Sequence, residues 1–111
     1  MRLLLILPLL TACAHAPAEL TAAKASVDSR LEYAYFTGNN RPDGLEPHQT
    51  NCVGFSKAYT VAAKESGFLP VRFNCRTPRG EVHQAVQVGE WVLDNRYPMV
   101  VPLQGYDCKP I

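Results

Sequence analysis

The spacing of hydrophobic residues along this chain changes from helical to alternating, and the change predicts where its elements lie. Apolar residues between Ala18 and Phe36 approximate one helical face, made of Leu20, Ala23, Val27, Leu31, Ala34 and Tyr35. A second helix is predicted from Cys52 to a terminating Gly67, on the spacing of Phe55, Tyr59 and Ala62. Beyond Gly67 apolar and polar residues alternate, which is the pattern of strands.

Three strands are expected in this second half. The first, Val71 to Arg76, would direct Val71, Phe73 and Cys75 inward. The other two, Val82 to Val88 and Trp91 to Asp94, would form a hairpin, because Gly89-Glu90 suits a two-residue turn. The stretch 38–49 between the helices is rich in turn-forming residues, and we expect an irregular loop there.

The two-residue turn decides which side chains share a face of the hairpin. Ala85 then pairs with Asp94, so the side chains of His83 and Asp94 emerge on the same face. The two become diagonal neighbours about 7–8 Å apart at the backbone, which their side chains can bridge with a hydrogen bond. A three-residue turn would place them on opposite faces. The other face is apolar and holds Val86, Val88, Trp91 and Leu93.

Cys52 begins the second helix, with Thr50 or Asn51 as its N-cap. Unpaired backbone N–H groups and the positive end of the helix dipole favour a thiolate at this position. His83 and Asp94 follow in the order that a Cys-His-Asp triad needs. The alternative is that Cys52 is a small buried residue or half of a disulfide.

The amino terminus predicts export. Residues 3–10 are apolar apart from the uncharged Pro8, follow Arg2, and are too few to span a bilayer as a helix, so they are typical of a signal peptide. The tetrapeptide that ends in Cys13 resembles the lipobox of bacterial lipoproteins. This resemblance implies a signal peptide at 1–12, a lipid on Cys13, a tether at 13–18 and a mature domain at 13–111. A plain signal peptide cut near Ala14 or Ala16, or an untranslocated hydrophobic start, is the alternative.

Composition adds limits on the partners and on the use of cysteine. The 111 residues allow one domain, and a formal net charge of +1 argues against a nucleic-acid partner. Export permits disulfides, and with Cys13 and Cys52 assigned, Cys75 and Cys108 remain as an even pair. A Cys75–Cys108 bridge is our hypothesis, although sequence leaves open a pairing of Cys52 with either. No C-x-x-C or H-x-x-x-H spacing occurs, so structural zinc is not expected.

These motifs resemble the bacterial transglutaminase-like cysteine proteinase family. The resemblance lies in the helix opened by Cys52, in His83-Gln84-Ala85-Val86, and in Trp91-Val92-Leu93-Asp94-Asn95. It implies an α+β fold of papain or transglutaminase type, in which helices pack on a small antiparallel sheet and the nucleophile opens a helix. It also implies nucleophile Cys52, base His83 and orienting residue Asp94. Members of the family include periplasmic proteases that clip surface adhesins.

Two features of the chain depart from that pattern or point elsewhere. In the adhesin-clipping members, acidic residues beside the nucleophile help to bind calcium, whereas Asn51, Val53 and Gly54 flank it here, and we expect no metal and no cofactor. The stretch from Asn51 to Phe55 is also similar to the Asp-Cys-Ser-Gly-Phe opening of NlpC-type peptidoglycan peptidases. The presence of Asp94 and the short spacing to it favour the first family.

The sequence therefore predicts an exported cysteine peptidase or amidase. Its substrate would be a protein or peptide, including cell-wall peptide, and the backbone N–H of Cys52 would bind the oxyanion with help from Gln49 or Asn51. We expect a monomer held in the periplasm by its lipid, on the outer rather than the inner membrane. A non-catalytic lipoprotein that binds a partner, and a transferase that crosslinks amines, are the competing interpretations.

Overall fold

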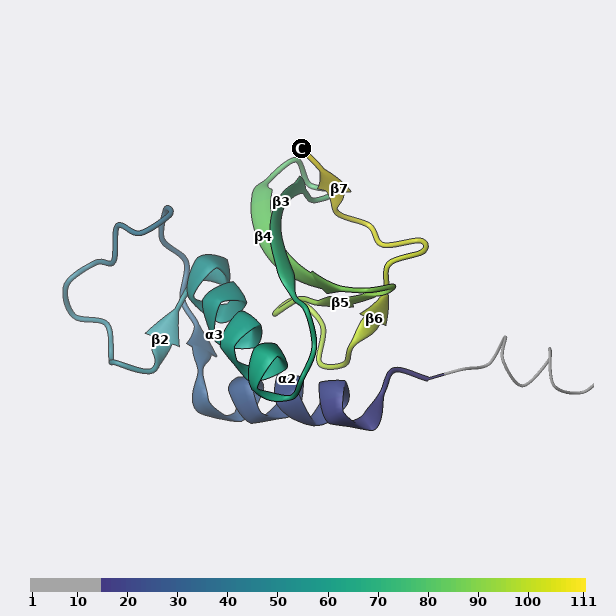
Figure 1. Ribbon diagram of the computed structural model, residues 1–111. Helices are drawn as coiled ribbons and strands as arrows, with labels where there is room; N and C mark the ends of the chain where they lie inside the picture. Colours follow the sequence, from purple (N-terminus) through teal and green to yellow (C-terminus); the bar gives the residue numbers. More distant parts are fainter. Residues whose placement is uncertain (1–14) are drawn as a thin grey trace, which may run out of the picture.

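The computed structural model of this chain describes residues 15–111, so the predicted signal peptide and Cys13 lie outside the described residues. Two helices pack on a curled antiparallel sheet, which confirms the expected α+β fold (Figure 1). The elements in chain order are α2 (Ala18–Arg30), β1 (Glu32–Tyr33), β2 (Gln49–Thr50), α3 (Cys52–Glu65), β3 (Val71–Arg76), β4 (Val82–Val88), β5 (Trp91–Leu93), β6 (Val101–Pro102) and β7 (Lys109–Pro110). Within 15–111 no helix is both long and apolar enough to cross a membrane.

The main sheet has five antiparallel strands in the order β6-β5-β4-β3-β7. The central hairpin has the predicted register, since Val88 pairs with Trp91 and Val86 with Leu93. Gly89 has φ 59°, a backbone conformation that glycine adopts at no steric cost and that this tight turn requires. The hairpin parity on which the sequence interpretation depended is therefore confirmed.

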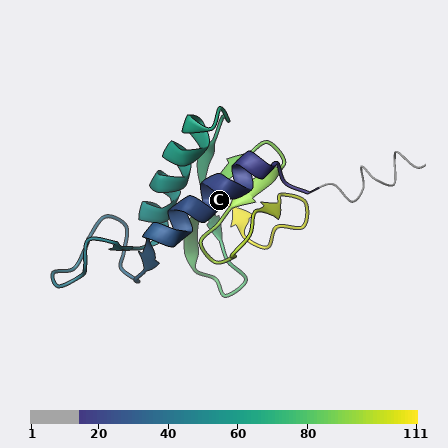
Figure 2. The same ribbon diagram turned by 90° about the horizontal axis from the view of Figure 1, so that it is seen from below.

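The hydrophobic core lies between the two helices and the apolar face of the hairpin. Figure 2, seen from below, shows α2 crossing α3 on this side of the sheet. The buried cluster consists of Leu20, Val27, Phe55, Tyr59, Ala63, Val86, Val88, Leu93 and Val100. A polar link joins the layers as well: the buried Lys24 of α2 donates to Asp28 at 2.6 Å and to the backbone oxygen of Tyr97.

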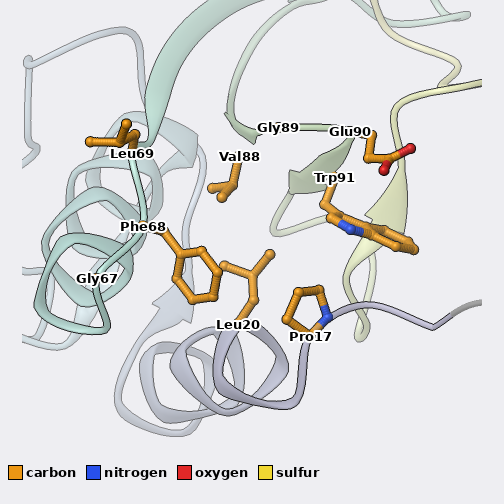
Figure 3. A pocket seen from close by; sticks show the side chains of 9 residues that line it. All are labelled: Pro17, Leu20, Gly67, Phe68, Leu69, Val88, Gly89, Glu90 and Trp91. Carbon is orange, nitrogen blue, oxygen red and sulfur yellow. The ribbon is translucent and has the colours of Figure 1, made fainter.

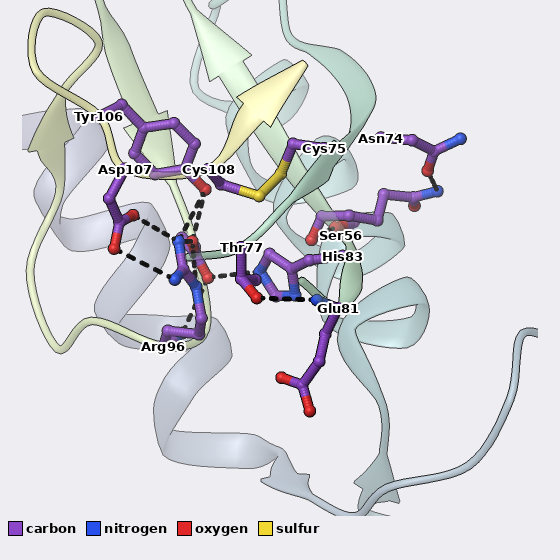
Figure 4. The surroundings of a disulfide bond; sticks show 12 residues. Ser56, Asn74, Cys75, Thr77, Glu81, His83, Arg96, Tyr106, Asp107 and Cys108 are labelled. Carbon is purple, nitrogen blue, oxygen red and sulfur yellow. Dashed lines mark hydrogen bonds and ion pairs between the residues drawn. A yellow bond between two sulfur atoms is a disulfide. The ribbon is translucent and has the colours of Figure 1, made fainter. Parts of the chain in front are cut away.

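The opposite face of the sheet is covered by the carboxyl-terminal segment, which the sequence analysis left unassigned. Strand β7 pairs with β3, and the ring of Tyr106 meets that of Phe73 edge-on, with centroids 6.1 Å apart. The expected disulfide between Cys75 and Cys108 is present and closes this layer (Figure 4). This segment therefore gives the sheet a second packed face.

Two predictions about the elements were wrong. The first helix ends at Arg30 and not at Phe36, because Leu31 is extended and the next residues pair in parallel with Gln49–Thr50 ahead of α3. Tyr35, which was expected on the buried helical face, is 78% exposed. The residues of β3 that were predicted to point inward are not all buried. Cys75 is fully buried, bonded to Cys108, whereas Val71, the first residue of the strand, is exposed.

We expect the double variant Cys75→Ser/Cys108→Ser to lose about 3–4 kcal/mol of unfolding free energy, because the bridge closes a loop with a sequence separation of 33. Both cysteines are replaced so that no new free thiol is left. Urea unfolding of this variant and of the unaltered protein at one pH measures the difference. Equal midpoints and equal slopes would contradict the expectation.

Candidate active site

Cys52 is the first residue of α3, and its local sequence holds it there. Asn51 is the N-cap, and its side-chain oxygen accepts from the backbone N–H groups of Val53 at 3.1 Å and Gly54 at 3.2 Å. A Cβ at Gly54 would lie 1.8 Å from Oγ1 of Thr50, so only glycine lets the incoming strand lie this close to the first turn. Cys52 is the free cysteine of the described residues and is half-buried.

Helix α3 is fixed against β4 at the level of the thiol. Ser56, one turn after Cys52, is fully buried and donates to the backbone oxygen of Gln84 at 3.1 Å. Gln84 is the neighbour of His83 in β4, so this hydrogen bond aligns the two elements that carry the thiol and the imidazole. Nothing in the spacing of Ser56 distinguishes it from an ordinary helical serine, and the sequence analysis missed it.

His83 and Asp94 meet as the hairpin register requires. His83 Nε2 lies 2.8 Å from Asp94 Oδ1, with the ring almost buried and the carboxylate fully buried. Since Nε2 is bound to Asp94, the other ring nitrogen, Nδ1, is the one left for a partner on the opposite side. Cys52 lies on this side of the ring, close enough that the thiol and the imidazole shift each other's pKa. The structure thus joins His83 to Asp94 and places Cys52 near His83, and the catalytic role of the three residues stays a prediction.

The ionisation of the three groups is mutually dependent. Burial would lower the pKa of His83, but the hydrogen bond to Asp94 and the interaction with the nearby Cys52 outweigh it and raise that pKa to about 9. Burial would raise the pKa of Cys52, yet His83 and the backbone at Gln84 bring it below its usual value. These opposite directions favour a thiolate–imidazolium pair at neutral pH.

Asp94 has further partners that the sequence analysis did not identify. Burial alone would raise its pKa, but hydrogen bonds from His83, Arg96 and Tyr106 hold the pKa of this carboxyl well below its usual range. Arg96 follows two residues later, and Tyr106 arrives from the carboxyl-terminal segment (Figure 4). Arg96 could have been suspected from its proximity in sequence, whereas Tyr106 carries no such signal.

The two side chains expected to help bind the oxyanion are engaged elsewhere. The amide nitrogen of Asn51 donates to the backbone oxygens of Phe36 and Gly38, both at 2.8 Å, and its oxygen caps α3. Gln49 binds Glu32 and the backbone N–H of Glu46 within the loop. In this structure the polar atoms of Asn51 and Gln49 hold the cap and the loop, and their help in binding the oxyanion stays a prediction. The Cys52 N–H is the first-turn amide that Asn51 does not bind.

An apolar hollow of about 440 Å³ lies elsewhere, at the carboxyl-terminal end of α3 (Figure 3). Its lining residues are Pro17, Leu20, Gly67, Phe68, Leu69, Val88, Gly89, Glu90 and Trp91. It holds no thiol and no imidazole, so the reactive groups belong to the other end of the helix. Among residues 15–111, no three side chains of the His, Cys, Asp and Glu types gather as a metal site.

We expect the unfolding free energy of Cys52→Ala to fall as the pH rises above about 6.5. His83 keeps Asp94 as a partner in this variant, so its folded pKa stays above the ordinary value of 6.5. A group whose pKa is higher in the folded state contributes its full stabilisation at pH values below its pKa in the unfolded state. That contribution is lost as the pH rises through its pKa in the folded state. Urea unfolding between about pH 6 and about pH 10 measures the slope, at most about 1.4 kcal/mol per pH unit.

The unaltered protein should have a flatter profile, because Cys52 acts in the opposite sense. Its pKa is lowered from 9.0, so its contribution is present above that value and is lost as the pH falls through the folded pKa. The matched control is Cys52→Ala/His83→Gln, which lacks both groups. If Cys52→Ala were as stable at about pH 9 as at about pH 6.5, the ionic pairing of His83 with Asp94 would be contradicted.

Comparisons with known proteins give a relationship of fold. No family model and no curated protein sequence matches the chain. Two solved structures of LapG from Legionella pneumophila, one of them calcium-bound, superpose with a TM-score of 0.60 at 13% sequence identity. The alignment covers 94% of this chain and 68% of the LapG chain. LapG has a transglutaminase-like fold, and at this identity the similarity shows that fold for the present chain.

Proposed function

We propose that this protein is a cysteine peptidase or amidase that cleaves an amide bond through a thioester. The observation that carries the proposal is the 2.8 Å bond between His83 and the buried Asp94, and it is supported by the nearby thiol of Cys52, whose pKa His83 lowers. LapG, which shares the fold, is a cysteine protease, and this makes the reaction class plausible. The chain spans 68% of the LapG structure, so the LapG substrate is not assumed.

In the proposed reaction, His83 Nδ1 accepts the thiol proton of Cys52, and the thiolate attacks the carbonyl carbon of an amide. The oxyanion that forms accepts a hydrogen bond from the Cys52 backbone N–H. The intermediate collapses when the imidazolium gives its proton to the leaving amine, which leaves a thioester on Cys52. Water, deprotonated by His83, then attacks the thioester, releasing a carboxylic acid and restoring the thiol. Asp94 holds the ring in the productive tautomer throughout.

The acceptor that resolves the thioester separates two versions of this function. Water gives hydrolysis, whereas a primary amine gives a crosslinked product, as in a transferase. Both substrate classes considered from sequence, proteins and cell-wall peptides, fit the same thiol chemistry. Product analysis with an unfolded protein or with peptidoglycan fragments, in the presence and absence of a primary amine, distinguishes these versions.

The non-catalytic alternative predicts a different state of Cys52. A binding module of this fold has no need of a solvent-accessible thiol with a lowered pKa. The half-buried position of Cys52, its lowered pKa, and the pairing of Cys75 with Cys108 instead support the enzyme. The thiol is therefore the atom to test.

We expect iodoacetamide, without reductant, to label Cys52 of the folded protein at neutral pH faster than an ordinary thiol. His83→Ala and Asp94→Ala should each slow this labelling by on the order of tenfold or more, because the thiolate loses the imidazolium that stabilises it. Mass spectrometry of the digested protein locates the adducts and gives their rates.

His48→Ala is the matched control, since this exposed histidine contacts Glu32 in the loop and belongs to no part of the triad. Its labelling rate should equal that of the unaltered protein. Adducts confined to Cys75 or Cys108, or a rate that His83→Ala leaves unchanged, would refute the nucleophile assignment. Loss of amide cleavage in Cys52→Ala is the corresponding test on substrate.

We also propose that a lipid on Cys13 anchors the domain to the periplasmic side of a membrane, in the outer rather than the inner one. The lipobox-like tetrapeptide Leu10-Thr11-Ala12-Cys13 supports this proposal, and the disulfide suits an oxidising compartment. The domain that would be tethered begins with α2 at Ala18.

We expect Cys13→Ser to move the expressed protein from the membrane fraction to the soluble fraction, because a lipid chain adds about 0.8 kcal/mol of membrane binding per buried methylene. Fractionation followed by immunoblotting measures the distribution. Ala12→Ser, which keeps the cysteine and a small residue before it, is the control and should stay with the membrane. An unchanged distribution for Cys13→Ser would argue against lipidation.

A further inference from the structure

The carboxylate of Asp94 is held by more groups than an orienting residue needs. Oδ1 accepts from His83 Nε2 at 2.8 Å and from the backbone N–H of Arg96 at 2.9 Å. Oδ2 accepts from Arg96 Nε at 2.9 Å and Nη2 at 2.8 Å, and from the hydroxyl of Tyr106. Asp94 is 0% exposed, so these bonds replace its entire hydration. One oxygen serves the imidazole, and the other is fixed by Arg96 and Tyr106.

The guanidinium that fixes this oxygen is itself immobilised. Arg96 Nη2 also donates to Asp107 Oδ1 at 2.8 Å, and the rings of Tyr97 and Tyr106 lie 5.1 and 5.8 Å from its Cζ. A planar, multidentate fork of this kind sets the angle of a carboxylate as well as its charge, which a lysine does not do.

Tyr106 and Asp107 are held in turn by the disulfide that follows them. Cys108 bonds to Cys75 of β3, and Cys75 is the direct cross-strand partner of His83 in β4. Figure 4 shows Tyr106, Asp107 and Cys108 on one side of Arg96, with Cys75 and His83 on the adjacent strands. The support of Asp94 is therefore connected covalently to the strand beside the imidazole.

We propose that Arg96 and Tyr106 are positioning residues that aim Asp94 at His83 and thereby set the reactivity of Cys52. Neither residue forms a hydrogen bond with the thiol or the imidazole, and both act through their bonds to Asp94. The proposal rests on the proposed function in one respect, namely that the thiol of Cys52 pairs with His83 in the working protein.

The ionisable groups around this carboxylate come from several elements. The groups that face it or its partners are Cys52 and Tyr59 of α3, His83 of β4, Arg96 and Tyr97 of the turn after β5, and Tyr106 and Asp107 of the carboxyl-terminal segment. Besides the imidazolium of His83, Arg96 is the cation among them that contacts Asp94 directly, so replacing Arg96 with lysine keeps the charge and removes the fork.

The experiment measures the rate of Cys52 alkylation by iodoacetamide from about pH 5 to about pH 9 in the folded, disulfide-bonded protein. In Arg96→Lys the midpoint of the profile should move to higher pH by about one unit, which makes labelling on the order of tenfold slower below it. The reason is that a carboxylate free to turn stabilises the imidazolium less. Tyr106→Phe should move the midpoint in the same direction by about half as much, and it carries the test if Arg96→Lys does not fold.

Tyr97→Phe is the matched control. It removes one hydroxyl from the same cluster, which donates to Asp107 at 2.8 Å and not to Asp94, so its midpoint should stay in place. If the unaltered protein has a low midpoint and neither Arg96→Lys nor Tyr106→Phe changes it, the positioning role is wrong, while the triad remains supported. An ordinary thiol profile in the unaltered protein would overturn both. Urea unfolding of every variant separates these shifts from a loss of stability.

Discussion

The structure depends on keeping one carboxylate ionised where no water reaches it. A charge taken out of water costs several kcal/mol unless hydrogen bonds and an opposite charge replace the lost solvent. Asp94 meets this condition with partners from three parts of the chain: the strand that carries His83, its own turn at Arg96, and the carboxyl-terminal segment at Tyr106. The fold can be understood as the arrangement that brings these three parts to one point.

Each layer contributes to that arrangement in a different way. The helices supply the thiol and a buried cation, Lys24, whose ammonium holds the backbone oxygen of Tyr97 at the far end of the turn that contains Asp94. The apolar face of the hairpin, packed on α2 and α3, fixes the register that turns His83 and Asp94 to the same side. Packing on one face of the sheet therefore determines the chemistry on the other.

The sequence predicted the parts that follow from local rules. A glycine at the first turn position set the hairpin register, so the meeting of His83 with Asp94 could be predicted. The cap residue Asn51 and the apolar spacing set the start of α3, so the position of Cys52 could be predicted as well. The role of Tyr106 could not be predicted. It lies twelve residues after Asp94, in a carboxyl-terminal segment that has no hydrophobic periodicity to show where it packs. The end of the first helix was mispredicted for a similar reason: its last turn competes with pairing to Gln49–Thr50, and propensity alone does not register that partner.

The length of α3 separates the two ends of the molecule. Its first residue is Cys52, and just past its end Gly67 lines the apolar hollow together with Pro17, the N-cap residue of α2. Fourteen residues at about 1.5 Å each place these ends about 20 Å apart. The sulfur consequently lies about a helix length from Pro17, so a surface that touched the domain at the start of α2 would leave the thiol end of α3 uncovered.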